Sequence, residues 1–203
     1  MKIICVGQNY REHNRELGSK DPEEPVIFMK PESAKLHSDR PFFIPEFSNE
    51  LHYETEIIIR INRLGRHIAP KFAHRYYDEV GLGIDFTARD LQSKLKAEGK
   101  PWELSKAFDG SAVISSFIPK SRFEDIQNID FHLNIDGNTV QRGNTADMIF
   151  PVDELIAFIS RFFTLKMGDI IFTGTPAGVG PVAINNRLEG FIGEQKMFAF
   201  NVK

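Results

Sequence analysis

Residues 51–61 of the chain read LHYETEIIIRI, and the β-branched run at the end of this segment predicts a core-forming β-strand. Side chains alternate between the two faces of a strand, so Glu54 and Glu56 point the same way, with Cβ atoms roughly 7 Å apart. Two carboxylates held side by side repel each other, and burying either one without compensation is costly. We therefore expect a cation between them. From these residues alone, it is either a divalent metal ion or a lysine or arginine side chain.

Length and composition predict an ordinary globular protein. The chain has 203 residues, of which 41% are hydrophobic and 26% charged, and we expect residues 1–203 to form a single domain. A net charge of −3 gives no broad basic surface, which argues against a nucleic-acid partner. The single cysteine, Cys5, excludes a disulfide within the chain and favours a reducing compartment. No apolar run is long enough to span a membrane and no signal peptide is evident, so we expect a cytoplasmic protein.

The local patterns indicate a mainly β protein with a few helices, an α+β fold. We expect strands over residues 1–7, 26–31, 51–61, 103–108, 130–135, 138–141 and 168–173, and a final hairpin between 187–190 and 196–200. We expect helices over residues 10–17, 69–80 and 151–163, and one from Thr87 to the stop signal at 99–101. Residues 32–50 show no periodicity, so we expect an irregular segment there.

The helix that begins near Thr87 has the features of a functional site. Thr87 is a good N-cap, and Asp90 three residues later supplies the acidic half of a capping box. Asp85 lies just ahead of this N-terminus. Arg89 and Gln92 are three residues apart and therefore share a helix face that can look back toward Asp85.

The possible metal ligands are all oxygen atoms, from Glu54, Glu56 and Asp85. Hard oxygen ligands select Mg²⁺, Mn²⁺ or Ca²⁺ rather than zinc. The sequence contains neither the His-Glu-x-x-His zinc motif nor the Gly-x-Ser-x-Gly nucleophile motif.

Two further segments carry candidate groups. His13 and Glu16 lie three apart on the first helix, either as an exposed ion pair or as a functional pair. The glycine-rich residues 173–180 lack the Lys-Ser/Thr ending of a nucleotide-binding loop. We expect them to hold a small carboxylate through backbone amides and the Thr175 hydroxyl.

An ordered series of motifs resembles the fumarylacetoacetate hydrolase family, in its small single-domain branch of acylpyruvases and oxaloacetate decarboxylases. The series covers nearly the whole chain and consists of GQNYREH (7–13), FMKP (28–31), HYETE (52–56), DFTARDLQ (85–92), PW (101–102) with Lys106, DMIF (147–150), TL (164–165) and GDIIFTGTP (168–176). Each block is weak by itself, whereas their order is highly specific.

The resemblance implies a mixed β-roll or barrel, usually a homodimer, with Mg²⁺ or Mn²⁺ in an open-ended site. By position, Glu54, Glu56 and Asp85 correspond to the metal ligands, and Lys106 to the active-site lysine. Gln92 and Thr175 correspond to substrate-binding positions, and His13 with Glu16 to the catalytic pair that small members carry on a lid helix. Arg89 is a further substrate-binding candidate, or it simply neutralises the neighbouring carboxylates.

These assignments predict metal-dependent cleavage of a carbon–carbon bond in β-dicarbonyl 2-oxo acids, by acylpyruvate hydrolysis, oxaloacetate decarboxylation or both. The common intermediate would be a pyruvate enolate. Two alternatives stay open. One is a hydratase, decarboxylase or isomerase of a longer 2-oxo dioic acid, and the other is a catalytically silent metal-binding scaffold.

Overall fold

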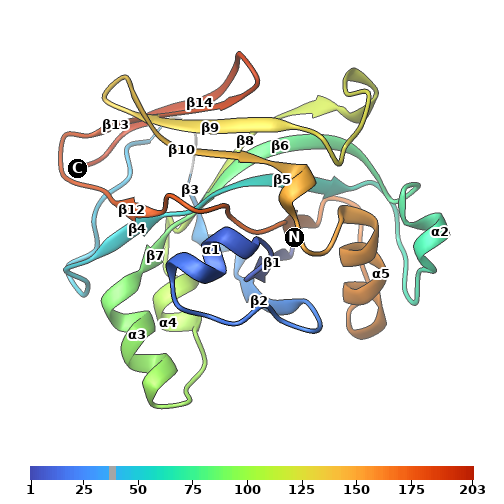
Figure 1. Cartoon of the computed structure of the whole chain (residues 1–203), viewed down its shortest axis with the longest axis horizontal. Helices are drawn as coiled ribbons and strands as arrows, with labels where there is room; N and C mark the ends of the chain where they lie inside the picture. Colours follow the sequence, from blue (N-terminus) through green and yellow to red (C-terminus); the bar gives the residue numbers. More distant parts are fainter. Residues whose placement is uncertain (37–39) are drawn as a thin grey trace.

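The computed structural model describes residues 1–36 and 40–203, which form three β-sheets with short helices around them (Figure 1). A seven-stranded sheet has the order β2-β1-β11-β5-β6-β8-β3, with bounds β1 Ile3–Gly7, β2 Val26–Lys30, β3 Lys35–Leu36, β5 Thr55–Ile61, β6 Tyr77–Asp85, β8 Ala112–Pro119 and β11 Ile170–Phe172. A four-stranded sheet has the order β10-β9-β13-β14, with bounds β9 Asp130–Ile135, β10 Asn138–Asn144, β13 Arg187–Ile192 and β14 Gln195–Asn201. A small third sheet joins β12 Gly180–Pro181, β4 Leu51–Tyr53 and β7 Thr87–Ala88.

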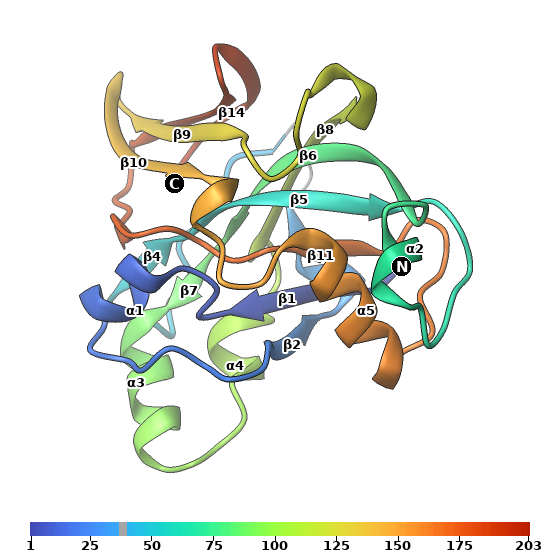
Figure 2. The same cartoon turned by 45° about the vertical axis from the view of Figure 1, so that its right-hand side comes forward.

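The helices occupy two ends of this assembly. They are α1 Arg11–Glu16, α2 Pro70–Ala73, α3 Arg89–Ala97, α4 Glu103–Lys106 and α5 Val152–Phe162, with 3-10 turns at Glu32–Ala34, Lys120–Arg122 and Thr145–Asp147. Figure 2 shows α1, α3 and α4 at the end where β4 and β7 lie, and α2 with α5 at the opposite end. None of the described helices is both long and apolar enough to cross a membrane.

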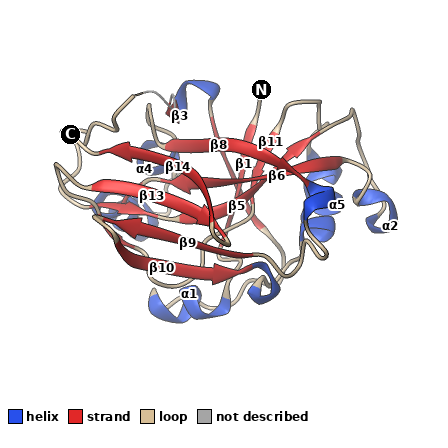
Figure 3. Cartoon of the chain, turned by 90° about the horizontal axis from the view of Figure 1, so that it is seen from above, coloured by secondary structure: helices blue, strands red, loops and turns tan. Residues whose placement is uncertain are grey.

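The four-stranded sheet packs across the middle of the larger sheet (Figure 3). Strand β9 alternates as its sequence predicts, so that Phe131 and Leu133 are buried against the larger sheet. Val80 and Leu82 of β6 pack with Phe131, and Ile84 of β6 packs with Leu133. The four-stranded sheet therefore covers this face of β6.

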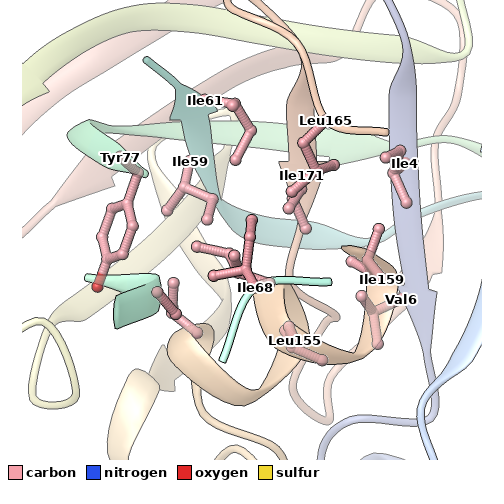
Figure 4. Packing of buried hydrophobic residues seen from close by; sticks show 13 residues of the cluster. Ile4, Val6, Ile59, Ile61, Ile68, Tyr77, Leu155, Ile159, Leu165 and Ile171 are labelled. Carbon is pink, nitrogen blue, oxygen red and sulfur yellow. The ribbon is translucent and has the colours of Figure 1, made fainter. Parts of the chain in front are cut away.

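Helix α5 packs on another part of the large sheet, formed by β1, β5 and β11. Its apolar residues recur at helical spacing, and the resulting stripe packs on β1, β5 and β11 (Figure 4). Leu155 and Ile159 of α5 lie against Ile59 of β5 and Ile171 of β11, all fully buried. Burying an aliphatic side chain of this size contributes about 1.5–3 kcal/mol, so this cluster anchors the strands that carry the site.

The mainly β, α+β fold and most of the expected elements are confirmed, but the predictions for residues 69–80 and 103–108 are wrong. The helix expected over residues 69–80 ends at Ala73, because Tyr77 begins β6, which pairs with β5 and β8. The strand expected over 103–108 is helix α4, whose first turn is closed by bonds from the amides of residues 105 and 106 to the carbonyl of Trp102. Residues 32–50 are largely irregular as expected, although β3 lies within them and residues 37–39 are outside the described part.

The capping box expected at Thr87 and Asp90 is also absent. Ala88 is the N-cap of α3 and no side chain caps the helix, because Thr87 belongs to β7. The Asp90 carboxylate accepts hydrogen bonds from the Ser48 hydroxyl (2.7 Å) and the Asn49 backbone N–H (2.9 Å), so it ties the preceding loop to α3.

Candidate functional site

Three carboxyl groups meet where β5 and β6 run side by side. Glu54 lies between β4 and β5, at the point where the chain passes from the small sheet into the large one; the strand expected over 51–61 is interrupted there. Glu56 is in β5, and Asp85 is the last residue of β6. One oxygen of each carboxylate lies within 4.8 Å of the others, and the residues are 5%, 2% and 1% exposed, respectively. The structure thus brings together the three predicted metal ligands.

The pairing of β5 with β6 holds this cluster in place. The strands are antiparallel and pair Thr55 with Ile84 and Glu56 with Gly83. The backbone N–H of Asp85 donates to the carbonyl oxygen of Glu54 (2.8 Å). Backbone hydrogen bonds therefore fix the spacing of the side chains even where β5 begins.

Two basic side chains neutralise Glu54. The Lys106 ammonium donates to Glu54 Oε2, Asp85 Oδ2 and Thr87 Oγ1, each at 2.7 Å, and Arg89 donates to Glu54 Oε1. Burial by itself lowers the pKa of Lys106, but Asp85 and Glu54 outweigh it, so its pKa is raised and the ammonium stays charged. Burial likewise acts to raise the pKa of Glu54, but Lys106 and Arg89 hold it well below its usual range.

Lys30, at the end of β2, is a further buried member of the cluster that was not predicted. Its Nζ lies 2.7 Å from Asp85 Oδ1. It donates to the Ser111 hydroxyl (2.9 Å) and to the backbone carbonyls of Lys106 and Ser111. These bonds fasten the loop after α4 beneath Asp85. The available signal was a lysine closing the otherwise apolar strand VIFMK before a proline.

Glu56 differs from the other two carboxylates because none of the described ion pairs includes it. Its one hydrogen bond comes from the Gly174 backbone N–H to Oε2 (2.7 Å). Burial, together with repulsion from Asp85 and Glu54, raises its pKa well above the usual value. Asp85 Oδ1 is also buried and has no hydrogen bond, although the Lys30 ammonium lies 2.7 Å away as an ion-pair partner.

These observations fit a divalent metal ion. The donor set is three carboxylates, one of which has no cation of its own, and a second has a buried oxygen left without a hydrogen bond. Oxygen-only ligands suit Mg²⁺ and Mn²⁺. Glu54, Glu56 and Asp85 are the residues that would hold the ion, and Lys106 shares two of them.

Helix α1 places the predicted His13–Glu16 pair beside this cluster. His13 Nδ1 lies 3.2 Å from Glu16 Oε2, and Glu16 also accepts from the Gly178 backbone N–H (3.1 Å). His13 is 5% exposed, and this burial lowers its pKa, so the imidazole is neutral near pH 7. The interpretation as an exposed ion pair is therefore wrong for His13.

A narrow cavity of about 30 Å³ lies among these groups. Its lining includes His13 from α1, Glu54, and Arg89, Gln92 and Lys96 from α3. It has room for only about two water molecules, so a bound acid requires the surrounding side chains to move. A larger hollow of about 600 Å³ lies beside Tyr10 and Arg142, but it contains none of the three carboxylates.

The glycine-rich loop after β11 does bind carboxylates, but they belong to the protein itself. The N–H of Gly174 donates to Glu56 and that of Gly178 donates to Glu16. Gly174 has φ +101°, and an added Cβ would lie 2.7 Å from Asn9 Cβ, so glycine is required there. The loop therefore links the metal-ligand cluster to the His13–Glu16 helix.

The three predicted substrate-binding residues have different surroundings. Arg89 donates to Gln92 Oε1 (2.7 Å), and both line the cavity. Thr175 is not among the lining residues. Its hydroxyl donates to the Thr55 carbonyl (3.0 Å) and accepts from Gln141 Nε2 (2.8 Å), so its proton is already engaged.

Comparison with known proteins gives consistent matches over the whole chain. A family profile described as fumarylacetoacetate (FAA) hydrolase C-terminal matches residues 2–200. An oxaloacetate tautomerase of Escherichia coli is 44% identical over 188 residues, covering 92% of this chain and 86% of that protein. A mitochondrial oxaloacetate decarboxylase of Dictyostelium discoideum is 46% identical over 182 residues, covering 89% and 84%.

The fold of this chain also matches solved structures of the family. A fumarylpyruvate hydrolase from Pseudomonas aeruginosa, in complex with Mn²⁺ and pyruvate, superposes with a TM-score of 0.93 at 35% identity, covering 100% of this chain and 89% of that one. Tautomerisation of oxaloacetate, for which the Escherichia coli relative is named, was not among the oxaloacetate reactions expected from the sequence.

Proposed function

Because the chain belongs to the fumarylacetoacetate hydrolase family, we propose that it is a metal-dependent enzyme that converts oxaloacetate and related β-dicarbonyl 2-oxo acids through an enolate. The family resemblance seen in the ordered motifs is confirmed by the profile match over residues 2–200. Relatives include both an oxaloacetate tautomerase and an oxaloacetate decarboxylase. Each reaction places negative charge on the 2-oxygen of an enolate, which is that of oxaloacetate in tautomerisation and that of pyruvate in decarboxylation.

The observation that carries the proposal is the buried, unpaired Glu56 beside Glu54 and Asp85. A divalent ion held by these residues would act as a Lewis acid toward the 2-oxo oxygen, where negative charge develops. We propose Mg²⁺ or Mn²⁺, which both suit oxygen ligands. One related structure contains Mn²⁺.

The charges of the surrounding residues support an anionic substrate. Lys30, Lys106 and Arg89 together balance the three carboxylates, so a bound divalent ion leaves the site with two positive charges. A 2-oxo acid brings one negative charge on its carboxylate, and a second develops on the enolate oxygen. The site is therefore complementary to the intermediate rather than to a neutral ligand.

His13 is the proposed base. With Nδ1 directed at the Glu16 carboxylate, the proton lies on Nδ1 and leaves Nε2 free to accept a proton. In tautomerisation, Nε2 takes a proton from C3 of oxaloacetate, the C–H electron pair forms the C2–C3 double bond, and the second electron pair of the C2–O double bond moves onto the 2-oxygen. This oxygen then takes the proton back from Nε2 to give the enol.

Decarboxylation gives the enolate of pyruvate instead, and it needs no removal of a proton from C3. The C3–C4 bond breaks, CO₂ leaves, its electron pair passes into the C2–C3 bond, and C3 then takes a proton. In an acylpyruvate, His13 would instead deprotonate a water molecule that attacks the distal carbonyl, and cleavage gives a carboxylic acid and pyruvate enolate.

The remaining predicted residues have positioning and electrostatic roles in this proposal. Lys106 is charged and buried, and would stabilise the developing oxyanion. Gln92 and Arg89 would orient the substrate carboxylate, while Thr175 would contribute only a hydroxyl lone pair.

The test uses EDTA-treated protein with and without added Mg²⁺ or Mn²⁺, and oxaloacetate enol, oxaloacetate and acetylpyruvate as substrates. Each rate is compared with that of the same metal without protein, because free divalent ions also promote oxaloacetate decarboxylation. We expect metal-dependent turnover of oxaloacetate that Glu54→Ala abolishes. A well-folded, metal-loaded protein without turnover of any of the three would support the silent-scaffold alternative instead.

We also propose that residues 1–203 act as one catalytic domain, as a homodimer, and in the cytoplasm. Dimerisation is tested by light scattering of the purified protein. Several relatives are named as mitochondrial proteins, so cellular location requires a separate measurement.

A further inference from the structure

Helix α3 presents three polar side chains to the active-site cavity. Arg89, Gln92 and Lys96 follow one another at intervals of three and four residues, which places them on one face of the helix, and all three line the cavity. Arg89 and Gln92 bond to each other, and Arg89 also pairs with Glu54. Lys96 is the last of the three along the helix, and it is exposed whereas Arg89 and Gln92 are buried.

Lys96 differs from the other cations of the site because it has no carboxylate partner among the described residues. Its side chain is partly open to solvent, and its ammonium lies 5.0 Å from the centre of the Trp102 ring, which also lines the cavity. Side chains of a helix lean toward its N-terminus, so Lys96 leans back toward Gln92 and the metal-ligand cluster.

Two cations and one carboxylate act on the Lys96 ammonium. Partial burial, Arg89 and Lys106 lower its pKa, Glu54 raises it, and the lowering prevails. An unpaired cation in such surroundings is stabilised when an anionic ligand arrives, which makes this position suited to a second negative group of the substrate.

We propose that Lys96 binds the distal carboxylate of the substrate. This role makes the enzyme selective for short 2-oxo dicarboxylic acids over 2-oxo monoacids, and it rests on the proposed function. The metal-ligand cluster takes the 2-oxo acid end, and Lys96, held against Trp102, takes the other end. Glu54 and Lys96 line the same cavity, so an acid that reaches both is short.

The matched pair of probes is oxaloacetate and 2-oxobutyrate, which have the same four-carbon skeleton and differ in a terminal carboxylate against a methyl group. We expect Lys96→Gln to raise KM for oxaloacetate about tenfold with little change in kcat, the effect of losing one charge-assisted hydrogen bond at a partly exposed site. Inhibition by 2-oxobutyrate should change less than twofold. Lys96→Arg should restore most of the oxaloacetate affinity.

The matched control is Lys94→Gln, which removes the same charge from the same helix on a face turned away from the cavity. We expect this variant to behave as wild type. Equal changes for both acids in Lys96→Gln, or no change for either, would overturn the assignment of Lys96.

A measurement without turnover separates this inference from the proposed function. The thermal shift of the Mg²⁺-loaded protein is recorded with each acid, and wild type should be stabilised more by oxaloacetate than by 2-oxobutyrate, a difference that Lys96→Gln removes. Absence of turnover with this binding difference intact would refute the proposed reaction but not the role of Lys96. Equal stabilisation of wild type by both acids would refute the role of Lys96.

Discussion

Replacing Glu56 by glutamine should stabilise the metal-free protein and remove its response to metal. Glu56 is 2% exposed and forms no ion pair among the described residues, so its charge has no direct partner when no metal is bound. In Glu56→Gln the amide oxygen can still accept from the Gly174 N–H, while the new NH₂ group can face Asp85 or Glu54. We expect the free energy of unfolding to rise by about 1–3 kcal/mol.

The assay is thermal unfolding in EDTA and in excess Mg²⁺. For a chain of this size, about 1 kcal/mol corresponds to a shift of roughly 2–4 °C in Tm, so the metal-free variant should melt measurably higher than wild type. Wild type should gain about 2.7 kcal/mol when Mg²⁺ is at a hundred times its Kd, and the variant should lose this gain. Glu124→Gln, an exposed change of the same charge, is the control.

The advantage of the glutamine variant should also grow with pH. The pKa of Glu56 in the folded protein is raised above the ordinary value of 4.5, so the folded state holds a proton that the unfolded state has lost in this range. Stability of the metal-free wild type therefore falls as pH rises through the range between the two values. A variant that melts below wild type in EDTA, or one that keeps the full Mg²⁺ response, would refute the reasoning.

Three other changes test separate parts of the site. His13→Ala should slow acetylpyruvate hydrolysis about 10²- to 10⁴-fold and oxaloacetate decarboxylation much less, because only hydrolysis needs an activated water; equal losses in parallel rate assays would contradict the role of His13. Mg²⁺ affinity should weaken by about tenfold per pH unit below the raised pKa of Glu56, because the proton competes with the ion; a pH series of Mg²⁺ titrations that shows constant affinity would exclude Glu56 as a ligand. Lys30→Met should lower the free energy of unfolding of metal-free protein by about 3–5 kcal/mol in urea, because it removes one cation of the buried ion pair with Asp85 and three hydrogen bonds to the loop after α4, whereas the exposed Lys35→Met should have little effect.

The candidate site was predictable from local sequence to the extent that it depends on strand periodicity and motif order. The alternation in residues 51–61 indicated that Glu54 and Glu56 would lie together, and helical spacing indicated the contacts of His13 with Glu16 and of Arg89 with Gln92. These distances depend on backbone geometry within a few residues, which is the same in any fold that contains the element.

Other features depended on neighbours far away in the sequence. Residues 77–80 have no strong local preference, and they become strand because β6 is paired on both sides by β5 and β8. Thr87 is a good helix cap by composition, but it pairs with β4 in a strand and accepts a hydrogen bond from Lys106. Local propensities of about 1 kcal/mol or less yield to such tertiary contacts.

The sequence by itself determined the strand alternation, the oxygen-only ligand set and the order of motifs that identifies the family. Only the tertiary structure decided that Lys30 and Lys106 neutralise Asp85, that Glu56 has no ion-pair partner among the described residues, and that Lys96 lines the same cavity as Glu54. The reason is physical: the charge state of a buried group depends on which side chains reach it through space, and chain order does not specify those distances.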